Sequence, residues 1–379
     1  MMVATAEAVA QRFGPEYWRE HDENEAYPDA FVSALGEHGF FGVTVPEALG
    51  GSGQGLSELV LVMEALCRGG GGGGPALGYL FGLLGTMTLA HAAASEEQLA
   101  CLRALASGAK LCAFALSEPD AGTNSFNMST TAIQREDDFV INGAKWFITN
   151  LQNSQSLLLV AQTQREGSNE SCGLSLFMVD LPNESLTFTP TPKHGFNYYK
   201  SNQLFIDNLV VPKTAVIGEV GKGFASLAPT LNAERLLVAA GAVGAARLAL
   251  QSAVGYAKER TVFRVPIGTH QAIQHPLAAA HANLEAAWLM IAEAAALDDT
   301  GTNPERAAGM ANMAKYVAVE AAIEACYQSL QAYGGAGYAR EYHQERWWRE
   351  VQLFRLAPLT QQMTLNFIGQ HVLGLPKSY

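Results

Sequence analysis

Residues 114–124, which read FALSEPDAGTN, stand where the chain changes from a helical to a β pattern, and residues 142–150, NGAKWFITN, follow about one hairpin later. Before about Lys110, apolar residues recur at three- and four-residue spacing, as in segments 57–68 and 95–107, which predicts helices. From about Leu111 to Val220 the pattern is one of short strands separated by turn residues, which predicts an antiparallel barrel or sandwich. The predicted strands are 139–142, 156–162, 174–179, 186–191 and 203–206.

The remainder of the chain is helical again. Its Ala- and Leu-rich segments 225–260, 270–298, 304–333 and 345–373 predict a four-helix bundle. The fold class is therefore mainly α with a central β domain: an N-terminal helical domain over 1–110, a middle β-barrel domain over 111–222 and a C-terminal four-helix bundle over 223–379. A run of six glycines, 69–74, follows a helix and lacks GK[ST], so we expect a flexible turn and not a phosphate loop.

Composition excludes some classes of function. The chain has 379 residues and a formal net charge of −12, which argues against nucleic acid or an anionic membrane surface as the main partner. Its five cysteines are scattered without a CxxC, which favours reduced thiols in a cytoplasm and gives no metal site. No run of about 18 uninterrupted apolar residues occurs, so we expect no membrane span and a soluble, cytoplasmic protein.

Three further stretches lie in the predicted bundle: 260–263 (RTVF), 270–274 (HQAIQ) and 331–338 (QAYGGAGY). Each alone could be an ordinary turn or helix end. Together, in order and spacing, the five stretches resemble the signature motifs of the acyl-CoA dehydrogenase family over nearly the whole chain. The resemblance implies a flavoprotein oxidoreductase of fatty acid metabolism, which removes the α-proton of an acyl thioester with a glutamate while the β-hydrogen passes to FAD as hydride.

The resemblance also implies which residues hold FAD. Those of the β domain would contact the flavin and the diphosphate, and those of the bundle would hold the diphosphate and adenine, several of them from a neighbouring subunit of a homodimer or homotetramer. The implied cofactor-binding residues are Phe114, Leu116, Ser117, Gly122, Thr123, Phe147, Thr149, Arg260, Phe263, Gln271, Gln331, Gly334, Gly335, Thr360 and Gln362.

The catalytic base departs from the commoner family pattern. Many members carry it as a glutamate near the C-terminus, and alignment on Thr360 puts Pro358 at that position. The isovaleryl-CoA and long-chain acyl-CoA dehydrogenase branch places it on a bundle helix before an arginine, which matches Glu234 here. The resemblance thus implies Glu234 as the base, with Thr123, Asn232 and Arg235 contacting the substrate. A simpler interpretation of Glu234 is an acid stabilised by the dipole of a helix N-terminus.

Pro358 raises a second expectation. In the family, a backbone N–H at this position helps to polarise the thioester carbonyl, and proline has none. We therefore expect a remodelled C-terminal loop. The helical stretch from Tyr79 to Leu89 is expected to line the acyl chain, with Gly82 and Gly85 leaving depth.

Several alternatives remain open from the sequence. The thioester could be carried by acyl carrier protein instead of CoA, or the chain could be a flavin-dependent monooxygenase on the same fold. A flavin-less helical adaptor or catalytically inactive subunit is the non-enzymatic alternative. By family analogy, the electron acceptor is an electron-transfer flavoprotein or a similar protein.

Overall fold

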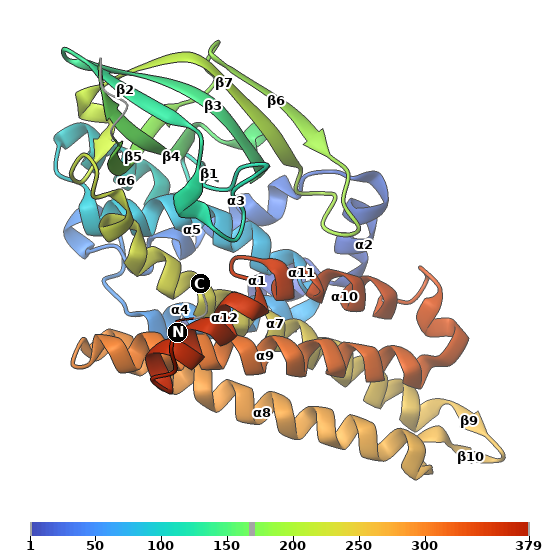
Figure 1. Ribbon diagram of the computed structural model, residues 1–379. Coiled ribbons are helices and arrows are strands. Elements are labelled where there is room, and N and C mark those ends of the chain that lie inside the picture. Colours follow the sequence, from blue (N-terminus) through green and yellow to red (C-terminus); the bar gives the residue numbers. More distant parts are fainter. Residues whose placement is uncertain (1, 167–170, 378–379) are drawn as a thin grey trace.

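The computed structural model describes residues 2–166 and 171–377 and shows a β domain seated on a helical body (Figure 1). The N-terminal region is helical, as expected. Apolar residues at helical spacing pack its helices into the core, including Leu59, Val62, Met63 and Leu66 of the fourth helix. Its helices are α1 (Met2–Arg12), α2 (Pro15–Asn24), α3 (Asp29–Glu37), α4 (Leu56–Leu66), α5 (Gly74–Ala92) and α6 (Glu96–Ala106).

The middle region forms an eight-stranded sheet with the strand order β6-β7-β3-β2-β4-β5-β8 and with β1 paired to β4. The strands are β1 (Cys112–Ala115), β2 (Thr131–Arg135), β3 (Asp138–Thr149), β4 (Ser156–Arg165), β5 (Ser171–Asp180), β6 (Leu186–Thr191), β7 (Ser201–Pro212) and β8 (Val216–Ile217). Most pairs are antiparallel, but β4 pairs in parallel with both β1 and β2. Each predicted strand lies within an observed one. Among the described residues, β6 and β8 do not pair with each other, so the sheet does not close by that contact.

The C-terminal region is built on three long helices, α7 (Gly223–Glu259), α8 (Gln271–Thr300) and α9 (Pro304–Tyr333). The short strands β9 (Thr261–Val262) and β10 (Val265–Pro266) form a hairpin between α7 and α8. Helix α7 packs against α4, α5, α8 and α9. Its small residues allow close approach, because a Cβ on Gly241 would lie 2.7 Å from the Cβ of Ala76. Helix α7 is long and apolar enough to cross a membrane, but 72% of its most apolar window is buried inside the protein.

The expected fourth long helix over 345–373 is wrong in detail. The chain forms α10 (Gln344–Val351), α11 (Leu353–Leu356) and α12 (Gln361–Phe367), and it leaves the helical conformation at residues 357–360. Pro358 lies in this break, and a proline disfavours the helical conformation in the residue that precedes it. The break produces the separate C-terminal loop that carries Pro358.

The glycine run is packed and not a flexible linker. Gly70 and Gly71 are buried, and a Cβ on Gly72 would lie 2.3 Å from the Trp347 ring. A Cβ on Gly74 would lie 2.4 Å from the ring of Trp18. The missing side chains allow two tryptophans to pack against the turn between α4 and α5.

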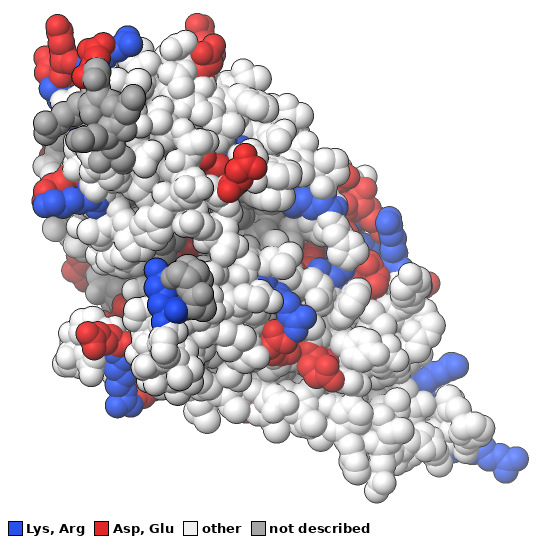
Figure 2. All heavy atoms as spheres, viewed as in Figure 1, with Lys and Arg blue, Asp and Glu red and all other residues white. Residues whose placement is uncertain are grey.

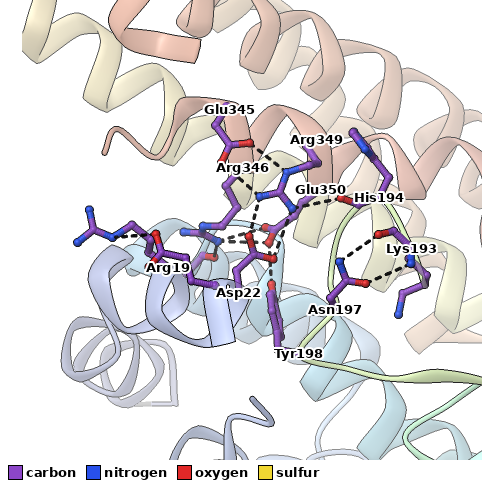
Figure 3. Close-up of polar contacts among 12 residues, drawn as sticks. Arg19, Asp22, Lys193, His194, Asn197, Tyr198, Glu345, Arg346, Arg349 and Glu350 are labelled. Atoms are coloured by element: carbon purple, nitrogen blue, oxygen red, sulfur yellow. Dashed lines mark hydrogen bonds and ion pairs between the residues drawn. The ribbon is translucent and has the colours of Figure 1, made fainter. Parts of the chain in front are cut away.

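A buried polar cluster joins the three regions (Figure 3). Arg349 of α10 pairs with Asp22 of α2 at 2.7 Å and donates to the carbonyl of His194 at 3.3 Å. Next to it, the Tyr198 hydroxyl donates to the buried Glu350 carboxylate at 2.7 Å. This junction fixes the helical regions and the loop before β7 relative to one another. On the face shown in Figure 2, basic and acidic side chains alternate and form no continuous basic patch.

Candidate functional site

Glu234 is a buried acid in α7 with only 6% of its surface exposed. No hydrogen bond to its carboxylate occurs among the described residues, and Arg235 is the one charged neighbour that acts on its ionisation. Burial raises its pKa from 4.5 to about 7, and Arg235 opposes this rise. Glu234 lies more than two turns inside α7, so the interpretation as a first-turn acid at a helix N-terminus is wrong.

The face of α7 that carries Glu234 points towards the β domain and α5. Leu231, one turn before Glu234, shares a hydrophobic cluster with Phe114 and Leu116. Thr230, also one turn before, shares a hydrogen bond of 3.0 Å with Thr88 of α5, and both side chains are fully buried. The structure therefore brings the candidate base towards the 114–117 stretch, although the two are far apart in sequence.

The suggestion that small residues of α5 leave depth for an acyl chain is wrong for the positions named. A Cβ on Gly82 would lie 2.0 Å from the Phe41 ring, and one on Gly85 would lie 2.7 Å from Cys112. The space beside both glycines is thus occupied by neighbouring side chains.

Asn232 and Arg235 are linked, since Nη1 of Arg235 donates to Oδ1 of Asn232. Burial lowers the pKa of Arg235, and its buried Nε has no partner among the described residues. Asn232 lines a cavity of about 310 Å³ between the start of α7, the end of α8 and the start of α9. The cavity is mostly apolar and lies on another face of α7 than Glu234, because two residues correspond to about 200° of helical rotation.

The loop with Pro358 is held against α9 by a buried lysine that the sequence interpretation missed. Lys315, which is fully buried, donates to the carbonyl of Leu359 at 2.8 Å and to Oε1 of Gln361 at 2.9 Å. Thr360 caps α12 by accepting from the Met363 N–H. The side chain of Gln362 is exposed. The signal available in the sequence was a lysine in the mostly apolar stretch 307–319.

The candidate flavin residues of the β domain form a partly open surface. Phe147 is 56% exposed and adopts a φ of 60° at an irregularity of the β3–β7 pairing, and its ring stacks on Trp146 with centroids 4.6 Å apart. The Ser117 hydroxyl has no partner among the described residues, whereas Thr149 shares a hydrogen bond of 2.9 Å with Ser201.

The donor set of this surface fits a flavin. An exposed aromatic ring, a free hydroxyl and a buried threonine hydroxyl suit a flat aromatic ligand with polar edges. Nothing lies within 4 Å of a Cβ built on Gly122, so the backbone there is open to close approach by a ligand, and Thr123 beside it is exposed. Phe114 and Leu116 are partly buried behind this surface.

The bundle candidates lie elsewhere. They gather where α7 ends, α8 begins and α9 ends, and Tyr256 of α7 stacks on Tyr333 of α9 there with centroids 4.0 Å apart. All of these candidates are exposed, and Phe263 has the largest exposed fraction, 87%. They are Arg260, Phe263, Gln271, Gln331, Gly334 and Gly335. Figure 1 places the β9–β10 hairpin at the end of the bundle away from β1 and β3. One chain therefore does not bring the two sets of candidates together.

Comparison with known proteins identifies the family of the chain. Models of the N-terminal, middle and C-terminal domains of acyl-CoA dehydrogenases match residues 1–109, 113–209 and 221–373. Acyl-CoA dehydrogenase FadE12 of Mycobacterium tuberculosis is 36% identical over 99% of this chain and 96% of its own.

Two further relatives carry named acyl-CoA ligands or partners. The caffeyl-CoA reductase–Etf complex subunit CarC of Acetobacterium woodii is 36% identical over 91% of this chain and 89% of its own. The structure of glutaryl-coenzyme A dehydrogenase with glutaryl-CoA superposes with a TM-score of 0.92 at 28% identity, over 100% of this chain and 95% of the other. The chain belongs to the acyl-CoA dehydrogenase family, whose members are FAD-dependent oxidoreductases that act on CH–CH groups.

Proposed function

We propose that this chain dehydrogenates an acyl-CoA between its α and β carbons and that Glu234 removes the α-proton. The burial of Glu234, without a hydrogen-bond partner among the described residues, carries this proposal. FAD, when bound, supplies the acceptor for the β-hydrogen. Pro358 supports the assignment, because it stands where many relatives have their glutamate.

The environment of Glu234 suits a general base. A base transfers protons best when its pKa lies near the working pH, and the pKa of Glu234 is raised to about 7 by burial. Because only the ionised carboxylate can accept a proton, the rate of the chemical step should rise with pH through about 7. The positive charge of Arg235, next in sequence, favours the ionised form of Glu234 and limits how far its pKa rises.

FAD binding requires a second copy of the chain in this proposal. Leu116, Ser117, Phe147 and Thr149 would contact the flavin from one copy. The exposed residues at the far end of the bundle, among them Arg260 and Gln331, would hold the diphosphate and adenine of FAD bound to the neighbouring copy. The separation of the two sets in Figure 1 supports this arrangement. Thr360 and Gln362 would add contacts from the C-terminal loop.

Thr123, Asn232 and Arg235 are the proposed contacts of the carrier arm of the thioester. The cavity beside Asn232 is not assigned to this arm, because it lies on another face of α7 than Glu234. CoA is favoured over acyl carrier protein and over a monooxygenase substrate, because the relatives named above are described with acyl-CoA or CoA thioesters. An electron-transfer flavoprotein in the cytoplasm is the proposed acceptor, by analogy with CarC.

Anaerobic mixing of the FAD-loaded protein with acyl-CoA and acyl-carrier-protein thioesters tests the proposal. We expect acyl-CoA to bleach the flavin absorbance and Glu234→Gln to bind FAD but lose bleaching by several orders of magnitude. Glu350→Gln is the matched control, since Glu350 is also a buried carboxylate but lies in the junction of Figure 3. Bleaching of the Glu234 variant at the wild-type rate would remove Glu234 from the mechanism.

A further inference from the structure

A buried ion pair connects the two signature stretches of the β domain. Nζ of Lys145 lies 2.9 Å from Oε1 of Glu118, and the side chains are 0% and 2% exposed. Neither residue has a role in the proposed chemistry. Burying two charges costs several kcal/mol of desolvation free energy per ion, so a buried pair is weak evidence of a contribution to stability. Its position therefore calls for another explanation.

Glu118 is held on its other side by the chain before β2. Its carboxylate accepts from the N–H of Ser129 at 2.5 Å, the hydroxyl of Ser129 at 2.8 Å and the N–H of Thr130 at 3.0 Å. Gly143 allows Thr130 to reach this position, because a Cβ on Gly143 would lie 2.4 Å from Oγ1 of Thr130. Burial opposes ionisation of Glu118, but Lys145 and these donors outweigh it and hold its pKa at about 2. The carboxylate thus keeps its charge and its place.

Lys145 connects the fixed carboxylate of Glu118 to the candidate flavin surface. Its ammonium donates to the carbonyl of Leu116 at 3.0 Å, and the next residue, Trp146, donates its N–H to the carbonyl of Ser117 at 2.9 Å. Two consecutive carbonyls are therefore tied to β3. Phe147, the candidate flavin-stacking ring, follows directly on the same strand.

We propose that the Glu118–Lys145 pair is a positioning unit that fixes the Leu116–Ser117 stretch against the flavin and keeps that edge electrically neutral, and so sets both FAD affinity and flavin reduction potential. The proposal rests on the proposed placement of FAD. Lys145 acts through Leu116 and needs no contact with the substrate. Two separable effects follow: a positional effect through the Leu116 carbonyl, and an electrostatic effect through the net charge of the pair.

The test uses the full-length holoprotein of Lys145→Met, Glu118→Gln and the double variant. The FAD dissociation constant is measured by fluorescence titration and the flavin midpoint potential by dye equilibration, both without substrate. Lys145→Met leaves an unpaired carboxylate, so we expect a lower potential and FAD binding weakened about tenfold, the effect of losing one charge-assisted hydrogen bond. The double variant should regain a potential close to wild type but still bind FAD about tenfold more weakly. Glu118→Gln keeps the lysine donor, so its FAD affinity should stay near wild type.

The matched control is Glu350→Gln, which also disrupts a fully buried ion pair, with Arg346, but in the junction of Figure 3 and without a contact to Glu118 or Lys145 among the described residues. It should change melting temperature without changing potential or FAD affinity. Normal potential and affinity in Lys145→Met would overturn the proposal, as would equally weak FAD binding in Glu118→Gln. If Lys145→Met does not fold, the FAD affinities of the double variant and of Glu118→Gln test the positional effect. These readouts need no turnover, so they are independent of whether Glu234 is the base.

Discussion

The stability of Glu234→Gln should increase relative to that of the wild type as pH rises. Burial raises the pKa of the folded-state carboxyl from 4.5 to about 7, so the folded protein binds this proton more tightly than the unfolded chain does. The stability contributed by the protonated carboxyl is fully present below pH 4.5 and is lost as pH rises through about 7. The difference between the two pKa values corresponds to about 3 kcal/mol of unfolding free energy. Solvent screens this effect little, because Glu234 is buried.

Differential scanning fluorimetry of wild type and Glu234→Gln from pH 5 to pH 9 measures this effect. Glutamine does not titrate, so the difference in melting temperature should grow towards alkaline pH. For a chain of this length, about 3 kcal/mol corresponds to about 4 °C. The control is Glu184→Gln, because Glu184 is exposed and makes no hydrogen bond among the described residues. A difference that stays constant over the whole pH range would show that Glu234 titrates normally and refute the reasoning.

Three further substitutions test other parts of the structure. Phe147→Ala should weaken FAD binding about tenfold with little change in melting temperature, because the ring is 56% exposed; a titration showing unchanged affinity would exclude it from the flavin site. Gly82→Ala should destabilise the protein by about 1–3 kcal/mol in urea denaturation, since the new Cβ would lie 2.0 Å from Phe41, and a neutral result would mean that this ring can move. Lys315→Met should lower the free energy of unfolding by about 3 kcal/mol in the same assay, because Leu359 and Gln361 lose a buried charged donor; wild-type stability would show that Lys315 does not hold the Pro358 loop against α9.

The elements could be predicted from the sequence because periodicity records which faces are buried. The strands around Phe139 and Leu176 and the long helices that follow Gly223 were each found from pattern alone. The prediction of one helix over 345–373 was wrong because Pro358 interrupts it. The prediction of a flexible glycine run was wrong because Trp18 and Trp347, which pack against it, come from distant parts of the chain.

The candidate site was predicted less completely. Glu234 could be selected from its motif, but its burial depends on how α7 packs against α5 and the β domain. Glu118 and Lys145 stand inside the quoted stretches and were passed over, because a sequence does not show that two charges 27 residues apart form one buried pair. Lys315 was missed because its hydrogen-bond partners, Leu359 and Gln361, lie 44 and 46 residues further along the sequence.

Proton exchange at the α-carbon tests the central assignment most directly. A non-oxidisable acyl-CoA analogue with an acidic α-proton can be incubated with the FAD-loaded protein in D₂O and followed by NMR. If Glu234 is the base, the wild type should exchange the α-proton and Glu234→Gln should not, although both bind FAD and the analogue. Exchange at the wild-type rate in the variant would show that another group removes the proton.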